Sequence, residues 1–127
     1  MSGSESSRLL RFVHFPQFLR DWQRLGLGDA ELRALEQEVL DAPAGAPVIA
    51  HTGGLRKLRF AAPGSGRGKR GALRVCYAYF PAHGTVALFV AFGKNERSDL
   101  SAVEARAIAR ALAGFETELR HQSEQQG

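Results

Sequence analysis

The residues most able to do chemistry in this sequence are basic, and they gather in one interval of the chain. No acidic residue lies between Asp41 and Glu96, and that interval holds Arg56, Lys57, Arg59, Arg67, Lys69, Arg70, Arg74 and Lys94. Unbalanced positive charge destabilises a fold by self-repulsion, so its spread over several elements predicts a polyanionic partner, RNA or DNA. A solvated loop that is basic by chance is the alternative, and we favour it less because the charge is not confined to one loop.

Arginine and lysine would contribute differently to such a site. An arginine grips a phosphate through two parallel N–H donors, whereas a lysine crowded by other cations can lose its proton and act as a base. All three lysines of the chain lie in this interval. Residues 64–71 (GSGRGKRG) do not form a nucleotide-binding P-loop, because neither Ser nor Thr follows Lys69. We expect these glycines to let a backbone or an RNA strand approach closely, with Lys69 and Arg70 supplying charge.

No other catalytic arrangement stands out. Cys76 is the single cysteine, and its place in an apolar segment predicts a buried, inert thiol. The histidines are scattered, and only His51, beside Gly53 and Gly54, is placed to approach a site. No Cys/His cluster has the spacing of zinc ligands. We therefore predict neither a metal nor another cofactor.

The composition is typical of a small intracellular protein. The 127 residues fit one domain, 44% of them are hydrophobic, and the formal net charge is +4. The N-terminus lacks the order of a secretory signal, and no apolar run reaches the roughly 20 residues that cross a bilayer. With a single cysteine, these features predict a soluble cytoplasmic protein that does not contact a membrane.

The first third of the chain predicts a strand and two helices. Residues 1–7 are small and polar and are expected to be disordered, while residues 8–15 are rich in large apolar side chains, as in a strand. Pro16 suits the first position of a helix, which ends near two glycines. Asp29 can cap a second helix that ends before Pro43, so the two helices form a hairpin.

The rest of the chain predicts three strands and a helix. Residues 55–60, 72–80 and 85–92 have strand patterns, separated by a loop over 63–71 and a hairpin turn over 81–84. Ser101 and Glu104 have the spacing of a capping box that opens a long helix, and residues 121–127 predict a flexible tail. We expect one α+β domain over 8–120 with the order β-α-α-β-β-β-α. It would be a small, mostly antiparallel sheet with an N-terminal helical hairpin and a C-terminal helix.

Several motifs in the second half of the chain resemble RelE-type toxins of the HigB branch, in the RelE/ParE superfamily of type II toxin–antitoxin systems. They are residues 53–57 (GGLRK), 68–71 (GKRG) leading into Arg74, 93–96 (GKNE), and Asp99 with Leu100, within a similarity over residues 48–112. The resemblance implies a RelE-like fold and a ribosome-dependent mRNA endonuclease (an mRNA interferase). It also implies mRNA, the ribosome and a cognate antitoxin as partners, the antitoxin usually carrying a helix-turn-helix domain.

By position, the resemblance implies roles for single residues. Arg74 matches the catalytic arginine of these toxins, Arg67 and Lys69 match the basic loop before it, and Lys94 matches a basic residue after the last strand. Phe92 stands where many relatives have tyrosine, so it keeps an aromatic surface and loses the hydroxyl.

The mechanism that we expect is cleavage without a metal, in which the 2′-hydroxyl of the RNA attacks the adjacent phosphorus. Arg74 would hold the phosphate, and Lys69 or Lys94 would act as the base. The predicted RNA-binding residues are Arg56, Lys57, Arg67, Arg70 and Phe92. Phe92 could equally belong to the core, and for Tyr79 a core position is favoured.

Two other classes of function remain open. A ParE-like toxin would share the fold and act on DNA gyrase without cutting RNA. The basic loop and Arg74 argue against it, because inhibition of a protein needs no cluster that grips phosphate. A non-catalytic nucleic-acid-binding module would show salt-dependent binding without cleavage.

Overall fold

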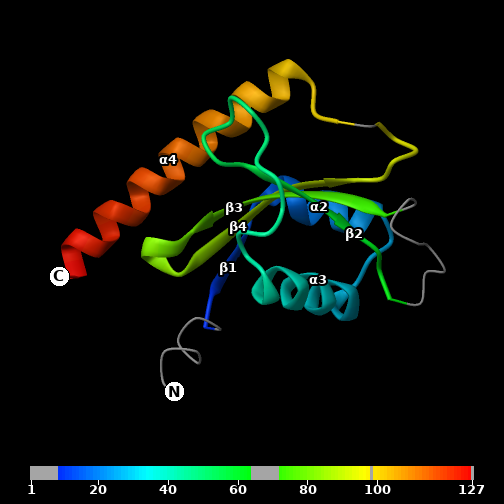
Figure 1. Ribbon diagram of the computed structural model, residues 1–127, viewed down its shortest axis with the longest axis horizontal. Helices are drawn as coiled ribbons and strands as arrows, with labels where there is room; N and C mark the ends of the chain where they lie inside the picture. Colours follow the sequence, from blue (N-terminus) through cyan, green and yellow to red (C-terminus); the bar gives the residue numbers. More distant parts are fainter. Residues whose placement is uncertain (1–8, 64–71, 98, 127) are drawn as a thin grey trace.

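A four-stranded sheet forms the centre of the chain in the computed structural model, which describes residues 9–63, 72–97 and 99–126 (Figure 1). The elements in chain order are β1 (Arg11–His14), α2 (Pro16–Arg24), α3 (Asp29–Asp41), β2 (Arg56–Phe60), β3 (Leu73–Phe80), the short 3-10 turn η2 (Pro81–His83), β4 (Thr85–Phe92) and α4 (Ala102–Gln126). This succession confirms the predicted α+β class and element order. The predicted disordered residues 1–7 lie outside the described residues, as do residues 64–71 of the predicted loop.

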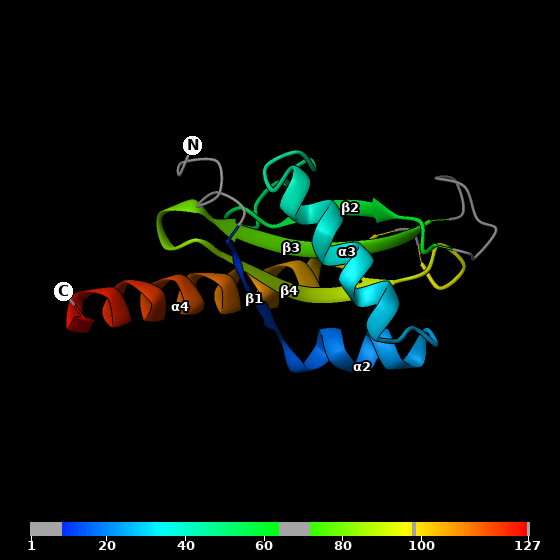
Figure 2. The ribbon, with the colours of Figure 1, turned by 90° about the horizontal axis from the view of Figure 1, so that it is seen from below.

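The strands follow the spatial order β1-β4-β3-β2. β3 is antiparallel to both of its neighbours, whereas the short edge strand β1 runs parallel to β4. The sheet is therefore mixed but mostly antiparallel, as predicted. α3 crosses one face of the sheet and α4 lies on the opposite face, with α2 beside the edge formed by β1 and β4 (Figure 1 and Figure 2).

Alternate residues of the central strands supply two cores, which explains why β3 and β4 are buried along nearly their whole length. The core on the side of α2 and α3, called the hairpin face below, includes Phe18, Trp22, Leu35, Val75 and Tyr77. The core on the other side, called the α4 face, includes Leu55, Cys76, Phe89, Ile108 and Leu112.

One irregularity in β4 decides which face its last residues occupy. The pairing of β3 with β4 shifts between Cys76 and Tyr77, which leaves Phe89 as an extra residue. An extra residue moves every following side chain to the other face of the strand. Strict alternation from Leu88 would place Phe92 on the hairpin face, but the bulge turns it onto the α4 face.

The start of α3 differs slightly from the prediction. Asp29 is the first helical residue, and Gly28 occupies the capping position. The N–H of Gly28 donates to the carboxylate of Glu31 at 2.8 Å. Asp29 therefore stabilises the helix through its charge in the first turn rather than as the cap.

The capping box that opens α4 is confirmed. The N–H of Glu104 donates to Ser101 Oγ at 3.1 Å, and the N–H of Ser101 donates to Glu104 Oε1 at 3.0 Å. Residues 121–126, predicted as a flexible tail, instead continue the helix to Gln126. Leu119 is buried just before them, so the helix is anchored there and the next residues extend it through backbone hydrogen bonds.

Candidate active site

Three residues that face one another across the strands define the candidate site. Arg59 of β2 pairs with Arg74 of β3, and Arg74 pairs with Phe92 of β4. Side chains at directly paired positions lie on the same face of a sheet, and Phe92 belongs to the core of the α4 face. The row of Arg59, Arg74 and Phe92 therefore lies on the α4 face, where β2 and β4 end and β3 begins.

Arg74 is a charged side chain that the fold almost buries. It is 9% exposed, and its Nη1 donates to the carbonyl of Ala72 at 2.6 Å, which fixes the guanidinium at the start of β3. Among the residues that the structure describes, no carboxylate forms an ion pair with it. A buried cation without a counter-charge costs free energy. This arrangement suits a site that receives its negative charge from a ligand.

Lys57 lies one row further along the same face, paired with Cys76. Its Nζ is 3.3 Å from the carboxylate of Asp99, which belongs to the segment between β4 and α4. The expectation that no acidic residue balances the positive charge of the basic interval is therefore wrong in part. The interval itself contains no acid, but the segment that follows it folds back and supplies one.

Cys76 lies beside these cations without being an available nucleophile. Its side chain is fully buried. Burial raises the pKa of the thiol to about 12, against the opposing effect of the positive charge on Lys57. The predicted burial of this cysteine is confirmed.

We expect Cys76 to resist Ellman's reagent in the native protein at neutral pH and to react as the single thiol of the chain in urea. The reagent has no access to the buried sulfur, and a thiol with a pKa near 12 contains almost no thiolate at neutral pH. The release of the coloured thiolate product measures both rates. Labelling of the folded protein as fast as that of the unfolded chain would contradict this prediction.

The ring of Phe92 lies under Arg97, a residue that the sequence analysis did not single out. Phe92 is 1% exposed, and Arg97 Cζ lies 4.5 Å from the centroid of its ring. Arg97 in turn pairs with the carboxylate of Glu104. Their hydrogen bond raises the pKa of Arg97 and lowers the pKa of Glu104, so the pair persists at neutral pH and is lost only as the pH falls through the lowered pKa of Glu104.

A tight turn after β4 carries Lys94 and brings Arg97 back over the sheet. The N–H groups of Glu96 and Arg97 both donate to the carbonyl of Gly93, and the N–H of Gly93 donates to the Glu96 carboxylate at 2.8 Å. Lys94 is exposed on this turn, beyond the row of paired residues. The sequence carries no local signal for the position of Arg97, because this turn and the pairing with Glu104 bring it there.

The other predicted RNA-binding residues do not join the row. Arg56 pairs with Tyr77, so it lies on the hairpin face. Its guanidinium donates to the carbonyls of Ala44 and Ala46 at 3.0 and 2.7 Å and thereby holds the segment between α3 and β2. The remaining predicted basic residues lie outside the described residues: Arg67, Lys69 and Arg70.

Two other side chains weighed as site residues lie elsewhere. Tyr79 packs against the core of the hairpin face, which confirms its predicted core position. His51 is exposed in the turn before β2, where its φ is +65°. Across the described parts of the chain, no three His, Cys, Asp or Glu side chains are grouped to hold a metal ion.

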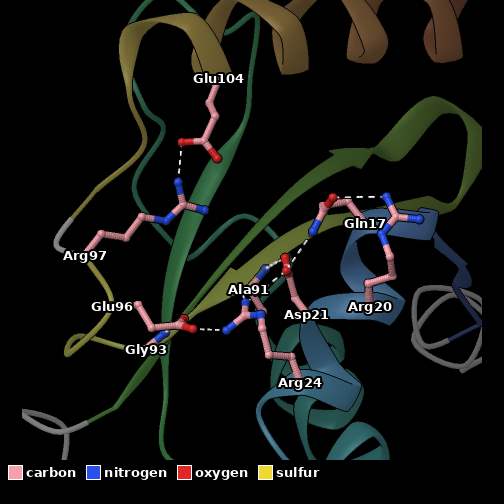
Figure 3. A network of polar contacts seen from close by, with 9 residues as sticks. All are labelled: Gln17, Arg20, Asp21, Arg24, Ala91, Gly93, Glu96, Arg97 and Glu104. Carbon is pink, nitrogen blue, oxygen red and sulfur yellow. Dashed lines mark hydrogen bonds and ion pairs between the residues drawn. The ribbon is translucent and has the colours of Figure 1, made fainter.

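A polar network connects α2 to the end of β4 (Figure 3). The buried carboxylate of Asp21 accepts hydrogen bonds from the N–H of Ala91 at 2.9 Å, from Gln17 at 2.8 Å and from Arg24 at 3.0 Å. Arg24 also donates to the carbonyl of Ala91 and pairs with Glu96. Beyond the end of β1, side chains of α2 thus take the place of a neighbouring strand and bond the backbone of β4. Through Glu96, they also hold the turn after β4.

The fold and the site define a small α+β protein whose mixed sheet carries three cations, Lys57, Arg59 and Arg74, on the face that it shares with its last helix. None of the helices in the described part of the chain has the length and hydropathy of a membrane-spanning segment.

This architecture is the fold of the E. coli RelE toxin, as predicted. A structure of that toxin in the free state, with two arginines replaced by alanine, matches with a TM-score of 0.50 and 17% identity over 80% of this chain and 95% of the toxin. The crystal structure of the isolated toxin matches with a TM-score of 0.50 and 17% identity over 81% of this chain and 99% of the toxin. No protein-family model matches the sequence.

Proposed function

We propose that the chain is the toxin of a type II toxin–antitoxin pair and an endoribonuclease that cuts mRNA on the ribosome. The observation that carries the proposal is Arg74, which is 9% exposed, lies beside Arg59, and has no carboxylate partner among the described residues. A phosphate matches a guanidinium in both charge and geometry. The RelE fold supports the proposal, and assignment to the HigB branch rests on the sequence motifs alone.

The proposed reaction is an internal transesterification of RNA. The 2′-oxygen forms a bond to the adjacent phosphorus while the bond from phosphorus to the 5′-oxygen of the next nucleotide breaks. A base takes the proton of the 2′-hydroxyl, and the leaving 5′-oxygen receives a proton. The products are a 2′,3′-cyclic phosphate and a 5′-hydroxyl.

In this reaction Arg74 holds the phosphate and stabilises the charge that develops on its oxygens. Lys94, exposed on the turn after β4, or Lys69 acts as the base. Lys69 precedes β3 and Lys94 follows β4, so the two lysines lie on opposite sides of Arg74 in the sequence.

Neighbouring phosphates would bind Lys57 and Arg59, which share the α4 face with Arg74, and also Arg67 and Arg70. Arg56 is assigned to holding the fold, because its guanidinium is bonded to backbone carbonyls. A cognate antitoxin of the helix-turn-helix type is the proposed partner. An acidic segment of such a partner would complement the same cations.

Expression in bacteria without an antitoxin tests the proposal. We expect growth arrest and new mRNA 5′ ends inside translated regions, mapped by primer extension, and neither effect with Arg74→Ala at an equal soluble level. Arg33→Ala is the matched control, because Arg33 is an exposed arginine of α3. Arrest with intact mRNA would contradict the endonuclease and favour ParE-like action on gyrase. Normal growth despite soluble protein would favour a non-catalytic nucleic-acid-binding module.

A further inference from the structure

A cavity of about 420 Å³ lies next to the proposed active site, between the start of α2 and the first half of α4. This volume falls within the roughly 300–1,000 Å³ of small-molecule sites. Its apolar walls include Phe15, Val90, Ala107, Ile108 and Ala111. Its polar lining consists of Gln17, Arg20, Arg97 and Glu104.

Arg97 connects this cavity to the row of paired residues. Its guanidinium lies over Phe92, 4.5 Å from the ring centroid, and the same side chain lines the cavity. Phe92 pairs directly with Arg74. Glu104 holds Arg97, and the capping box with Ser101 holds Glu104 in turn. The guanidinium of Arg97 is therefore held beside both Phe92 and the cavity.

We infer that the cavity binds an unpaired nucleobase of the RNA close to the cut phosphate, with Arg97 as the stacking platform. The inference rests on the proposed function. Unpaired bases stack on aromatic rings and on guanidinium planes, and here a guanidinium is already supported by an aromatic ring.

The lining matches the two kinds of surface that a base presents. The apolar walls suit its flat faces. At the edge of the base, Gln17, which already donates to Asp21, keeps its second amide N–H as a donor. Glu104, whose Oε1 is bonded to Arg97 and Ser101, keeps its other oxygen as an acceptor. In Figure 3, Gln17 and Arg20 of α2 lie on one side and Arg97 and Glu104 on the other, so the polar lining comes from two separate parts of the chain.

The charged and apolar groups around the cavity favour a nucleobase of RNA over two other ligands, a phosphate and an apolar protein side chain. A phosphate would meet apolar walls and the carboxylate of Glu104, so it does not suit the interior. An apolar side chain of a protein would fit the walls but would offer no hydrogen-bonding partner to the polar lining of the cavity. Arg97 also lies over Phe92, the strand partner of Arg74, so the cavity adjoins the proposed phosphate site.

RNA hexamers that carry 2′-O-methyl groups, and so cannot be cut by this reaction, test the inference by fluorescence anisotropy. One hexamer is intact, and each of the others lacks one base. We expect the wild-type protein to bind the intact hexamer on the order of tenfold more tightly than the hexamer that lacks the base of the cavity.

Three variants locate the base. Ala111→Trp fills the cavity from α4, and Arg97→Lys keeps the charge and the partner of Glu104 but removes the plane. Both should lose the roughly tenfold preference for the intact hexamer. Ala113→Trp is the matched control, because Ala113 is an exposed residue of the same helix outside the cavity lining, and it should keep the preference.

The possible failures are distinguishable. Equal binding of the intact hexamer and all abasic hexamers by the wild-type protein would overturn the inference, while the proposed function would stand if mRNA is still cut in an Arg74-dependent manner. Absence of both RNA binding and mRNA cuts would instead overturn the proposed function. A concentration-dependent dimer that Ala111→Trp abolishes, without any base preference, would assign the cavity to a second copy of the chain and overturn the inference.

Discussion

Replacement of Arg74 by methionine is expected to abolish RNA cleavage and to leave the protein at least as stable. The group that holds the phosphate is lost, so the rate should fall by at least about 100-fold, the typical cost of removing one donor that stabilises a developing oxyanion. No carboxylate of the described residues loses a partner, and the apolar stem still fills the site. The free energy of unfolding should therefore stay within about 1 kcal/mol of the wild-type value or rise.

Two measurements on the same purified variant separate function from folding. Cleavage is followed on ribosome-bound mRNA, and unfolding in urea is followed through the fluorescence of Trp22, the only tryptophan of the chain and a buried one. Arg33→Met, at an exposed position on α3, should change neither quantity. A loss of about 3 kcal/mol in Arg74→Met would mean that the guanidinium stabilises the fold, and the case for an anion site at Arg74 would fail.

Elements whose signals are local could be predicted from the sequence. The strand pattern over 85–92 coincides with β4, and the spacing of Ser101 and Glu104 marks the start of α4. The bulge at Phe89 could not be predicted, because no local pattern marks it, and Asp21, which accepts from the N–H of Ala91 next to the bulge, lies 70 positions away in the chain. The bulge decides on which face Phe92 lies.

The candidate site was also predictable only where its residues carry local signals. Sequence motifs indicate Arg74 and Lys57, and each of these residues is positioned by the single strand that contains it. Arg56 could have been separated from Lys57 by strand geometry alone, since adjacent residues of a strand point to opposite faces. Arg97 could not be recognised, because its environment depends on the path of the chain from β4 to Glu104.

Among the polar residues of the network in Figure 3, removal of the Asp21 carboxylate is expected to cause the largest loss of stability. In Asp21→Ala the N–H of Ala91 loses its acceptor, and Gln17 and Arg24 lose a shared partner inside the protein. The cost should be about 3 kcal/mol, because the buried N–H of Ala91 is left without an acceptor and the hydrogen bonds of the carboxylate to Gln17 and Arg24 are lost. The melting temperature should fall by roughly 10 °C.

Asp41→Ala is the matched control, since Asp41 is an exposed carboxylate at the end of α3, and it should change stability by no more than about 0.5 kcal/mol. Thermal unfolding by circular dichroism measures both variants, and hydrogen exchange at Ala91 reports whether the edge of β4 has opened. If Asp21→Ala is as stable as Asp41→Ala, the end of β4 does not depend on α2. If it is destabilised and the exchange at Ala91 accelerates, the same carboxylate that pairs with the backbone of β4 also keeps Phe92 and Arg97 in place beside Arg74.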